Sequence, residues 1–130
     1  MRSYLTALII LSLVLFAHVQ GMEGNLYLKI PFYDIFVHML GGLGIGFFIS
    51  GLINSFKPDV SRRKLIIITG TLIFGIVWEL FEIRYNLAGH PFGTNAYYLD
   101  TLKDIIDDVV GGTLVALLWR SKIQRLKIKH

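Results

Sequence analysis

Four long apolar stretches constrain this chain more than any other feature of its sequence. They cover residues 3–19, 32–54, 64–85 and 99–119. A helix needs roughly 20 mainly apolar residues to cross a bilayer, and each stretch comes close to that length. Only 17% of the residues are charged, too few for the polar surface of a soluble domain. The sequence therefore predicts an all-α membrane protein, a single domain of four transmembrane helices over residues 1–130.

The first stretch has a second interpretation, a cleaved signal peptide, because Arg2 precedes a leucine-rich core. That core continues from Leu5 to Val19, and the AHVQG at its end is a poor match to a small-x-small cleavage site. We expect a retained helix, with cleavage as the alternative.

The basic residues predict the direction of the helices. The segment between the second and third stretches carries Lys57, Arg62, Arg63 and Lys64 against one acid, Asp59. The tail at 120–130 has no acid and five basic residues: Arg120, Lys122, Arg125, Lys127 and Lys129. Cytoplasmic loops are enriched in Lys and Arg, so both termini and the basic segment are predicted to be cytoplasmic (N-in/C-in). A basic tail beside an apolar helix marks the cytoplasmic side, and no nucleic-acid partner is expected.

Ionisable side chains recur at one level in the second, third and fourth stretches. Counting about 1.5 Å of rise per residue from the outer ends puts them roughly 3 to 14 Å deep. They are Asp34, His38, Glu79, Glu82, Asp104, Asp107 and Asp108. Their spacing of three and four puts those of each stretch on one helix face. Because a charge facing lipid costs roughly 2.5–3.5 kcal/mol, we expect them to line one pocket between the three helices, beneath the outer surface.

The predicted pocket holds more acids than bases. Some carboxyl groups must therefore hold protons, pair with Lys103, Arg84 or a protonated His38, or bind a cation. Carboxylates with one imidazole suit a divalent metal ion such as Mg²⁺, Mn²⁺, Ca²⁺, Zn²⁺ or iron, which would then be a cofactor. Its hypothetical ligands are His38, Glu79, Glu82, Asp104 and Asp108. The alternative is a water-filled vestibule whose acids are functionally idle, and Lys103 itself is expected at the surface.

Glycines accompany the ionisable residues. The GGLGIG at residues 41–46 superficially matches a nucleotide-binding loop, but it lacks the preceding strand and the following acid. The small-xxx-small spacing of Gly42 and Gly46 favours close approach of helices instead. The glycines predicted to pack helices together are Gly41, Gly42, Gly46, Gly75, Gly111 and Gly112.

Three short motifs occur in order along the chain: Asp34-x-x-x-His38, Glu79-x-x-Glu82 and Asp104-x-x-x-Asp108-x-x-Gly111. The set resembles that of the VanZ-like small membrane proteins, whose helices carry D-K-x-x-H, E-x-x-Q and D-x-x-x-N-x-x-G, and that of the related YjdF-like group. Ile35, Glu82 and Asp108 depart from the VanZ-like pattern, and the two acids make this site more acidic. The resemblance implies a multi-pass protein of a prokaryotic plasma membrane with a role in the cell envelope.

Three functions are compatible with the sequence. The first is an acidic outer-leaflet pocket that binds a cation, a polar envelope molecule or a lipid headgroup, with membrane lipids as partners. The second is a proton- or cation-coupled transporter or channel subunit, which would need a homo-oligomer around a pore. The third is a structural or accessory membrane protein. An enzyme that used the ion to activate water would have Glu79 or Asp104 as its base, but no nucleophile motif occurs and nothing in the sequence selects a substrate.

Overall fold

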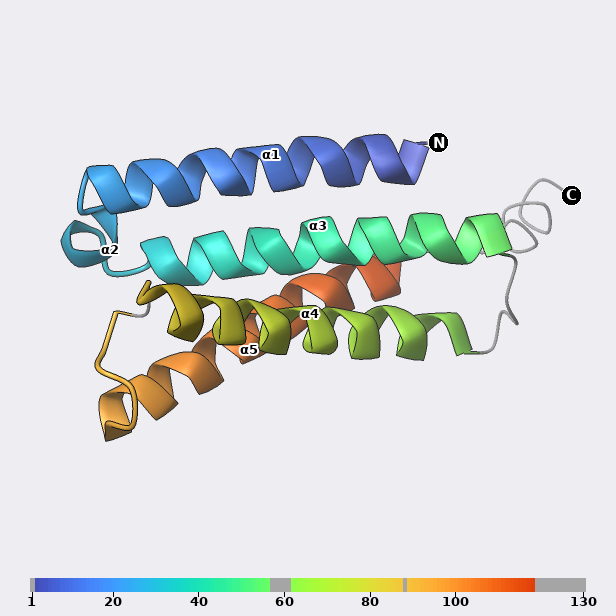
Figure 1. The fold of residues 1–130 in the computed structure, drawn as a ribbon. Coiled ribbons are helices and arrows are strands. Elements are labelled where there is room, and N and C mark those ends of the chain that lie inside the picture. Colours follow the sequence, from blue (N-terminus) through green and yellow to red (C-terminus); the bar gives the residue numbers. More distant parts are fainter. Residues whose placement is uncertain (1, 57–61, 88, 119–130) are drawn as a thin grey trace, which may run out of the picture.

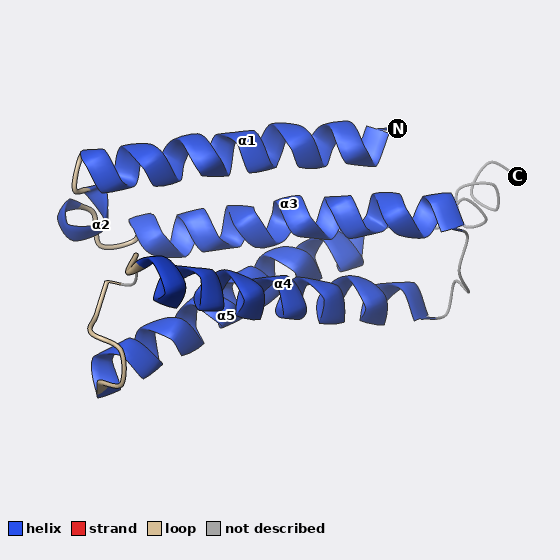
Figure 2. Cartoon of the chain, in the orientation of Figure 1, coloured by secondary structure: helices blue, strands red, loops and turns tan. Residues whose placement is uncertain are grey.

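The computed structural model describes residues 2–56, 62–87 and 89–118, and within these residues the regular elements are all helices (Figures 1 and 2). The helices are α1 (Arg2–Glu23), α2 (Leu26–Lys29), α3 (Tyr33–Phe56), α4 (Arg63–Tyr85) and α5 (Asn95–Leu118). The four long helices begin and end within a few residues of the apolar stretches. The all-helical part of the prediction therefore agrees with the structure.

The prediction of four membrane spans was wrong. α1, α3 and α4 are long and apolar enough to cross a membrane, and they are the three such helices in the described chain. α5 is long enough but not apolar enough to cross a membrane. Every stretch of 18 residues within it contains the same four charged side chains, those of Lys103, Asp104, Asp107 and Asp108. The expectation that both termini lie on one side depended on four spans, so it no longer follows. The basic tail at 120–130 lies outside the described residues.

α3 is the central helix of the bundle. It packs against α1, α4 and α5, and α4 also packs against α5. α1, α3 and α4 run almost parallel or antiparallel to one another, whereas α5 crosses them at an angle (Figure 1). Within the described residues, no close backbone contact joins α1 to α4 or to α5. Among the long helices, α1 therefore makes close backbone contacts with α3 alone in the described residues.

Large apolar side chains cover the outward faces of the bundle. Those on α1 and α4 include Leu5, Leu8, Leu13, Leu15, Phe16, Leu65, Ile73, Val77 and Leu80. Apolar patches of this extent are rare on soluble monomers, because they would face water. In a bilayer the same side chains face lipid hydrocarbon. The exposed surface thus agrees with the composition in indicating a membrane protein.

Glycines let α3 and α5 approach closely. A Cβ atom at Gly42 would overlap the backbone carbonyl of Asp108, and one at Gly111 would overlap the carbonyl oxygen of Met39. An added Cβ would also crowd a neighbouring helix at Gly46, Gly75 and Gly112. Gly41 differs, because a Cβ there would meet only Asp108 Oδ1, at an ordinary 3.5 Å. Five of the six glycines predicted to pack helices therefore lie at tight contacts, and Gly41 does not.

The turn between α4 and α5 is fixed by its polar residues. Asn86 ends α4 in the left-handed conformation (φ 55°), and its N–H donates to backbone carbonyls of the last helical turn. Thr94 caps the next helix, because its Oγ1 accepts a hydrogen bond from the N–H of Tyr97 at 3.2 Å. α5 therefore begins at Asn95, and its acidic first half lies at the same end of the bundle as the start of α3 (Figure 1).

Candidate functional site

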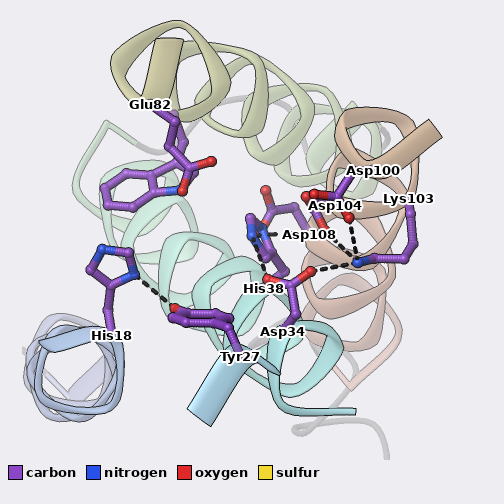
Figure 3. Close-up of polar contacts among 10 residues, drawn as sticks. His18, Tyr27, Asp34, His38, Glu82, Asp100, Lys103, Asp104 and Asp108 are labelled. Atoms are coloured by element: carbon purple, nitrogen blue, oxygen red, sulfur yellow. Dashed lines mark hydrogen bonds and ion pairs between the residues drawn. The ribbon is translucent and has the colours of Figure 1, made fainter. Parts of the chain in front are cut away.

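His38 lies at the centre of carboxylates contributed by two helices. α3 carries Asp34 one turn before His38, and α5 carries Asp104 and Asp108 one turn apart (Figure 3). His38 Nε2 lies 3.6 Å from Asp34 Oδ1 and 3.9 Å from Asp104 Oδ1. Its Nδ1 lies 3.5 Å from Asp108 Oδ1. We call these four residues the acidic site; Asp34 is partly exposed and the other three are buried.

Glycines on two helices leave room for the carboxylate of Asp108. Its Oδ1 lies 3.5 Å from the position of a Cβ at Gly41, and its Oδ2 lies 2.9 Å from that of a Cβ at Gly75. The tight contact at Gly42 holds the backbone of α5 against α3 at the same level. The acidic site is therefore built by the one-turn spacing of its acids together with glycines that admit them between the helices.

Lys103 brings a positive charge to the acidic site. Its ammonium donates a hydrogen bond to Asp34 Oδ2 and forms an ion pair with it. The same Nζ lies 3.1 Å from Asp104 Oδ1 and 3.2 Å from Asp100 Oδ1 (Figure 3). Lys103 was expected at the surface and, as one alternative, as a partner of the acids, and the pairing is what the structure shows. Its side chain is 38% exposed, yet it ties α5 to α3.

Carboxylates still outnumber the positive groups. Those of Asp34, Asp100, Asp104 and Asp108 surround one ammonium and one imidazole. Asp104 Oδ1 is buried and accepts no hydrogen bond of good geometry within the described residues, although Lys103 Nζ lies nearby. A buried polar atom without a hydrogen bond costs about 1–3 kcal/mol, part of which the ion pair with Lys103 offsets here. A proton or a second cation beside this oxygen would offset that loss.

Three residues have the arrangement of a metal site. Asp34, His38 and Asp104 each offer one ligand atom, and the three atoms lie within 4.8 Å of one another. Around a tetrahedral Zn²⁺ with bonds of about 2.1 Å, ligand atoms lie about 3.4 Å apart, so small side-chain movements would close the set. Of the five predicted metal ligands, this group contains His38 and Asp104. Asp108 lies at the opposite ring nitrogen of His38.

Three more residues predicted to line the pocket, Glu79, Glu82 and Asp107, are not part of the acidic site. Glu79 is buried in α4, and its Oε1 has no hydrogen-bond partner in the described residues. Glu82 accepts a hydrogen bond of 2.9 Å from Trp78 Nε1 and lies beside that indole (Figure 3). Asp107 is partly buried, with an Oδ2 that likewise has no partner among the described residues. None of these three acids belongs to the group of close ligand atoms found in the described chain.

A polar contact around His18 was not predicted from the sequence. His18 Nδ1 lies 2.8 Å from the hydroxyl of Tyr27, and its ring meets Trp78 edge-on at 5.6 Å between centroids (Figure 3). Burial raises the pKa of the Tyr27 phenol, so the neutral hydroxyl is available to donate to the imidazole. His18 thus connects α1 to α2 and α4. A single histidine in an apolar helix carries no periodic signal, so the sequence could not identify its partners.

A cavity of about 250 Å³ lies between α1, α3 and α4. Its apolar walls include Leu11, Val14, Val37, Ile45 and Phe74. His38 and Asp108 also line it, as do the paired rings of His18 and Trp78. The acidic site therefore borders both the polar end of the bundle and an apolar cavity inside it.

Comparisons with known proteins indicate a membrane protein and assign no activity. A family model described as "Predicted membrane protein (DUF2238)" matches residues 2–125. A protein of Thermotoga maritima, named "Uncharacterized protein", is 27% identical over 124 residues; the match covers 92% of this chain and 65% of that protein's length. No solved structure matches the chain. The resemblance to VanZ-like proteins receives no support from these matches.

Proposed function

We propose that this chain, which belongs to the family of predicted membrane proteins DUF2238, binds a divalent cation at Asp34, His38 and Asp104. The proximity of three ligand atoms from two helices carries the proposal. Two carboxylates and an imidazole form a mixed donor set that suits Mn²⁺, Zn²⁺ or Fe²⁺ better than Ca²⁺, whose sites use six or more oxygens. Three protein ligands also leave coordination positions for water or for an oxygen of a second ligand.

Lys103 occupies the place of the cation when none is bound. Its ammonium contacts the carboxylates of Asp34 and Asp104, the same two that belong to the ligand group. A bound cation would satisfy Asp104 Oδ1, the buried oxygen that now lacks a hydrogen bond. Since the lysine side chain is 38% exposed, it can move out as the cation enters. The ammonium and the divalent ion thus compete for one position.

The protein is proposed to lie in the plasma membrane of a prokaryote, with the acidic site in the outer leaflet. The basic segment with Lys57, Arg62, Arg63 and Lys64 joins α3 to α4 at the ends of these helices that lie far from the acidic site. Loops rich in Lys and Arg remain in the cytoplasm. The relative in Thermotoga maritima agrees with a prokaryotic setting.

Thermal unfolding of the purified full chain tests the cation site. A ligand that binds only the folded state stabilises it, by about 2.7 kcal/mol at 100 times its Kd. Mn²⁺ or Zn²⁺ should therefore raise the Tm of the wild type, and Asp104→Asn should abolish the increase. Asp107→Asn is the matched control, because Asp107 is on the same helix but outside the ligand group. No increase in the wild type, or equal increases in both variants, would contradict the proposal.

The Lys103→Met variant separates a cation site from a permanent salt bridge. If the ammonium competes with the ion, this variant is less stable without added metal, binds Mn²⁺ more tightly, and regains stability when Mn²⁺ is added. If Lys103 is simply the structural partner of Asp34 and Asp104, the variant loses stability and divalent ions do not restore it. The second result would favour the structural function over cation binding.

A further inference from the structure

The cavity between α1, α3 and α4 lies inside the part of the chain that can span a membrane. All three of these helices are candidate spans, and all of the cavity-lining residues except Asp108 belong to them. α1 and α4 form two of its walls, yet no close backbone contact joins them in the described residues. The rings of His18 and Trp78 meet across this gap. In a bilayer, the medium outside a gap between two spanning helices is lipid hydrocarbon.

The shape and lining of the cavity suit an alkyl chain better than they suit water molecules. On α1 it reaches from Leu11 to His18, about 10 Å along the helix, and on α3 from Val37 to Ile45, about 12 Å. Its volume is about eight times that of a water molecule in the liquid. Water fills cavities that offer it two to four polar partners, whereas apolar cavities stay dry and bind apolar molecules. Aliphatic side chains, two aromatic rings and three glycines make up most of this wall, so water would find partners only beside the few polar side chains.

We propose that the cavity binds an alkyl chain of a membrane lipid, which enters between α1 and α4. One end of the cavity is bordered by His38 and Asp108, so a chain seated there brings the polar part of its lipid to the acidic site. The proposal goes beyond cation binding, because the chain contacts the apolar wall and not the metal ligands. Each can fail without the other.

The test uses vesicles of phosphatidylethanolamine that contains a photoactivatable diazirine in its acyl chain. The full-length protein is reconstituted, irradiated and digested, and the labelled residues are identified by mass spectrometry. Side chains on the outside of α1 and α4 will be labelled by any bilayer, so they decide nothing. The labelling of Val37 is the deciding measurement, because this residue is 5% exposed and lines the cavity from the central helix. The proposal expects labelling of Val37 and Ile45 at a level comparable to the outward face.

Two neighbouring residues on α1 supply matched variants. Val14 lines the cavity, whereas Leu13 is 57% exposed on the outside of the helix. Val14→Phe fills the cavity and should reduce labelling of Val37 and Ile45 at least fivefold, with the outward face of α4 labelled as before. Leu13→Phe should leave the whole pattern unchanged. Circular dichroism and Tm of both variants show whether the bundle is intact, and a backup variant, Leu11→Phe, fills the cavity at another position of α1.

The inference fails if Val37 and Ile45 remain unlabelled in the wild type while outward residues react. It also fails if Val14→Phe and Leu11→Phe, both folded, leave the labelling of α3 unchanged. Neither result depends on added metal, so loss of the lipid site would not remove the cation site. Conversely, if Mn²⁺ does not raise the Tm of the wild type but Val37 is labelled, the lipid site is supported and the cation site is not.

Discussion

Replacing Gly42 by alanine should weaken the bundle far more than the same change at its neighbour Gly41. A Cβ at Gly42 would overlap the carbonyl group of Asp108 and crowd its Cα. These are backbone atoms, so no side-chain rotation relieves the overlap, and α5 has to move away from α3. A Cβ at Gly41 would meet one atom, Asp108 Oδ1, at 3.5 Å, which is an ordinary contact.

The two variants differ in sign as well as size. Overpacking costs about 1–3 kcal/mol, and a backbone contact belongs at the upper end of that range. Alanine in place of glycine inside a helix gains about 0.5–1 kcal/mol. The net expectation is a loss of about 2 kcal/mol for Gly42→Ala, against no loss or a gain of up to about 1 kcal/mol for Gly41→Ala.

Unfolding of the purified full chain in detergent, followed by circular dichroism, measures this difference. Because α5 carries Asp104, Gly42→Ala should also weaken Mn²⁺ binding by separating that ligand from Asp34 and His38 on α3. Gly41→Ala should bind Mn²⁺ as the wild type does. If the two variants unfold at the same temperature as the wild type, α3 and α5 do not meet at Gly42, and the geometry derived for the acidic site is refuted with that contact.

Two further predictions follow from contacts outside the acidic site. Tyr27→Phe removes the hydrogen bond to His18 and should lower the free energy of unfolding by about 0.5–1.5 kcal/mol. Tyr98→Phe is the control and should cause no loss, because Tyr98 is 55% exposed and its hydroxyl has no hydrogen bond in the described residues. Equal losses in the two variants would contradict the contact between Tyr27 and His18. For orientation, a cysteine at Lys57 should react with a membrane-impermeant maleimide only in opened cells, and one at Phe92 in intact cells; labelling of both from the same side would refute the proposed orientation.

The helices were predictable because their signals are local. Apolar runs fixed the four long helices to within a few residues, and Thr94 and Asn86 mark the turn before α5 in the sequence itself. The error lay in treating α5 as a membrane span. Its second half is apolar, but four charged side chains occur in every window long enough to span. Helix formation needs only local propensity, whereas spanning needs an uninterrupted apolar length.

The candidate site was predictable where one helix carries two of its members. The one-turn spacings of Asp34 with His38 and of Asp104 with Asp108 place each pair on one helix face, whatever packs around that helix. The position of Lys103 was not predictable, because its contact with Asp34 depends on how α5 crosses α3. Crossing angles and close contacts are set by packing between helices, to which a single sequence gives only indirect signals such as glycine spacing.

Glu82 shows the opposite case, a local contact that could have been predicted. It lies four residues after Trp78, a spacing at which side chains on a helix meet, and its carboxylate accepts the indole N–H. The hydrogen bond from Trp78 gives the Glu82 carboxylate a partner, so its position needs no metal ion to explain it. The close ligand group in the described residues accordingly omits Glu82.

Electron spin-echo spectroscopy of Mn²⁺ bound to the purified full chain tests the cation site most directly. Coordination by an imidazole produces nitrogen modulations, which carboxylates and water cannot produce. The wild type should bind one Mn²⁺ with a nitrogen modulation that His38→Ala removes, and Asp107→Asn should leave the modulation in place. Mn²⁺ that stays free in solution, or that binds without nitrogen modulation, would contradict a site made by Asp34, His38 and Asp104.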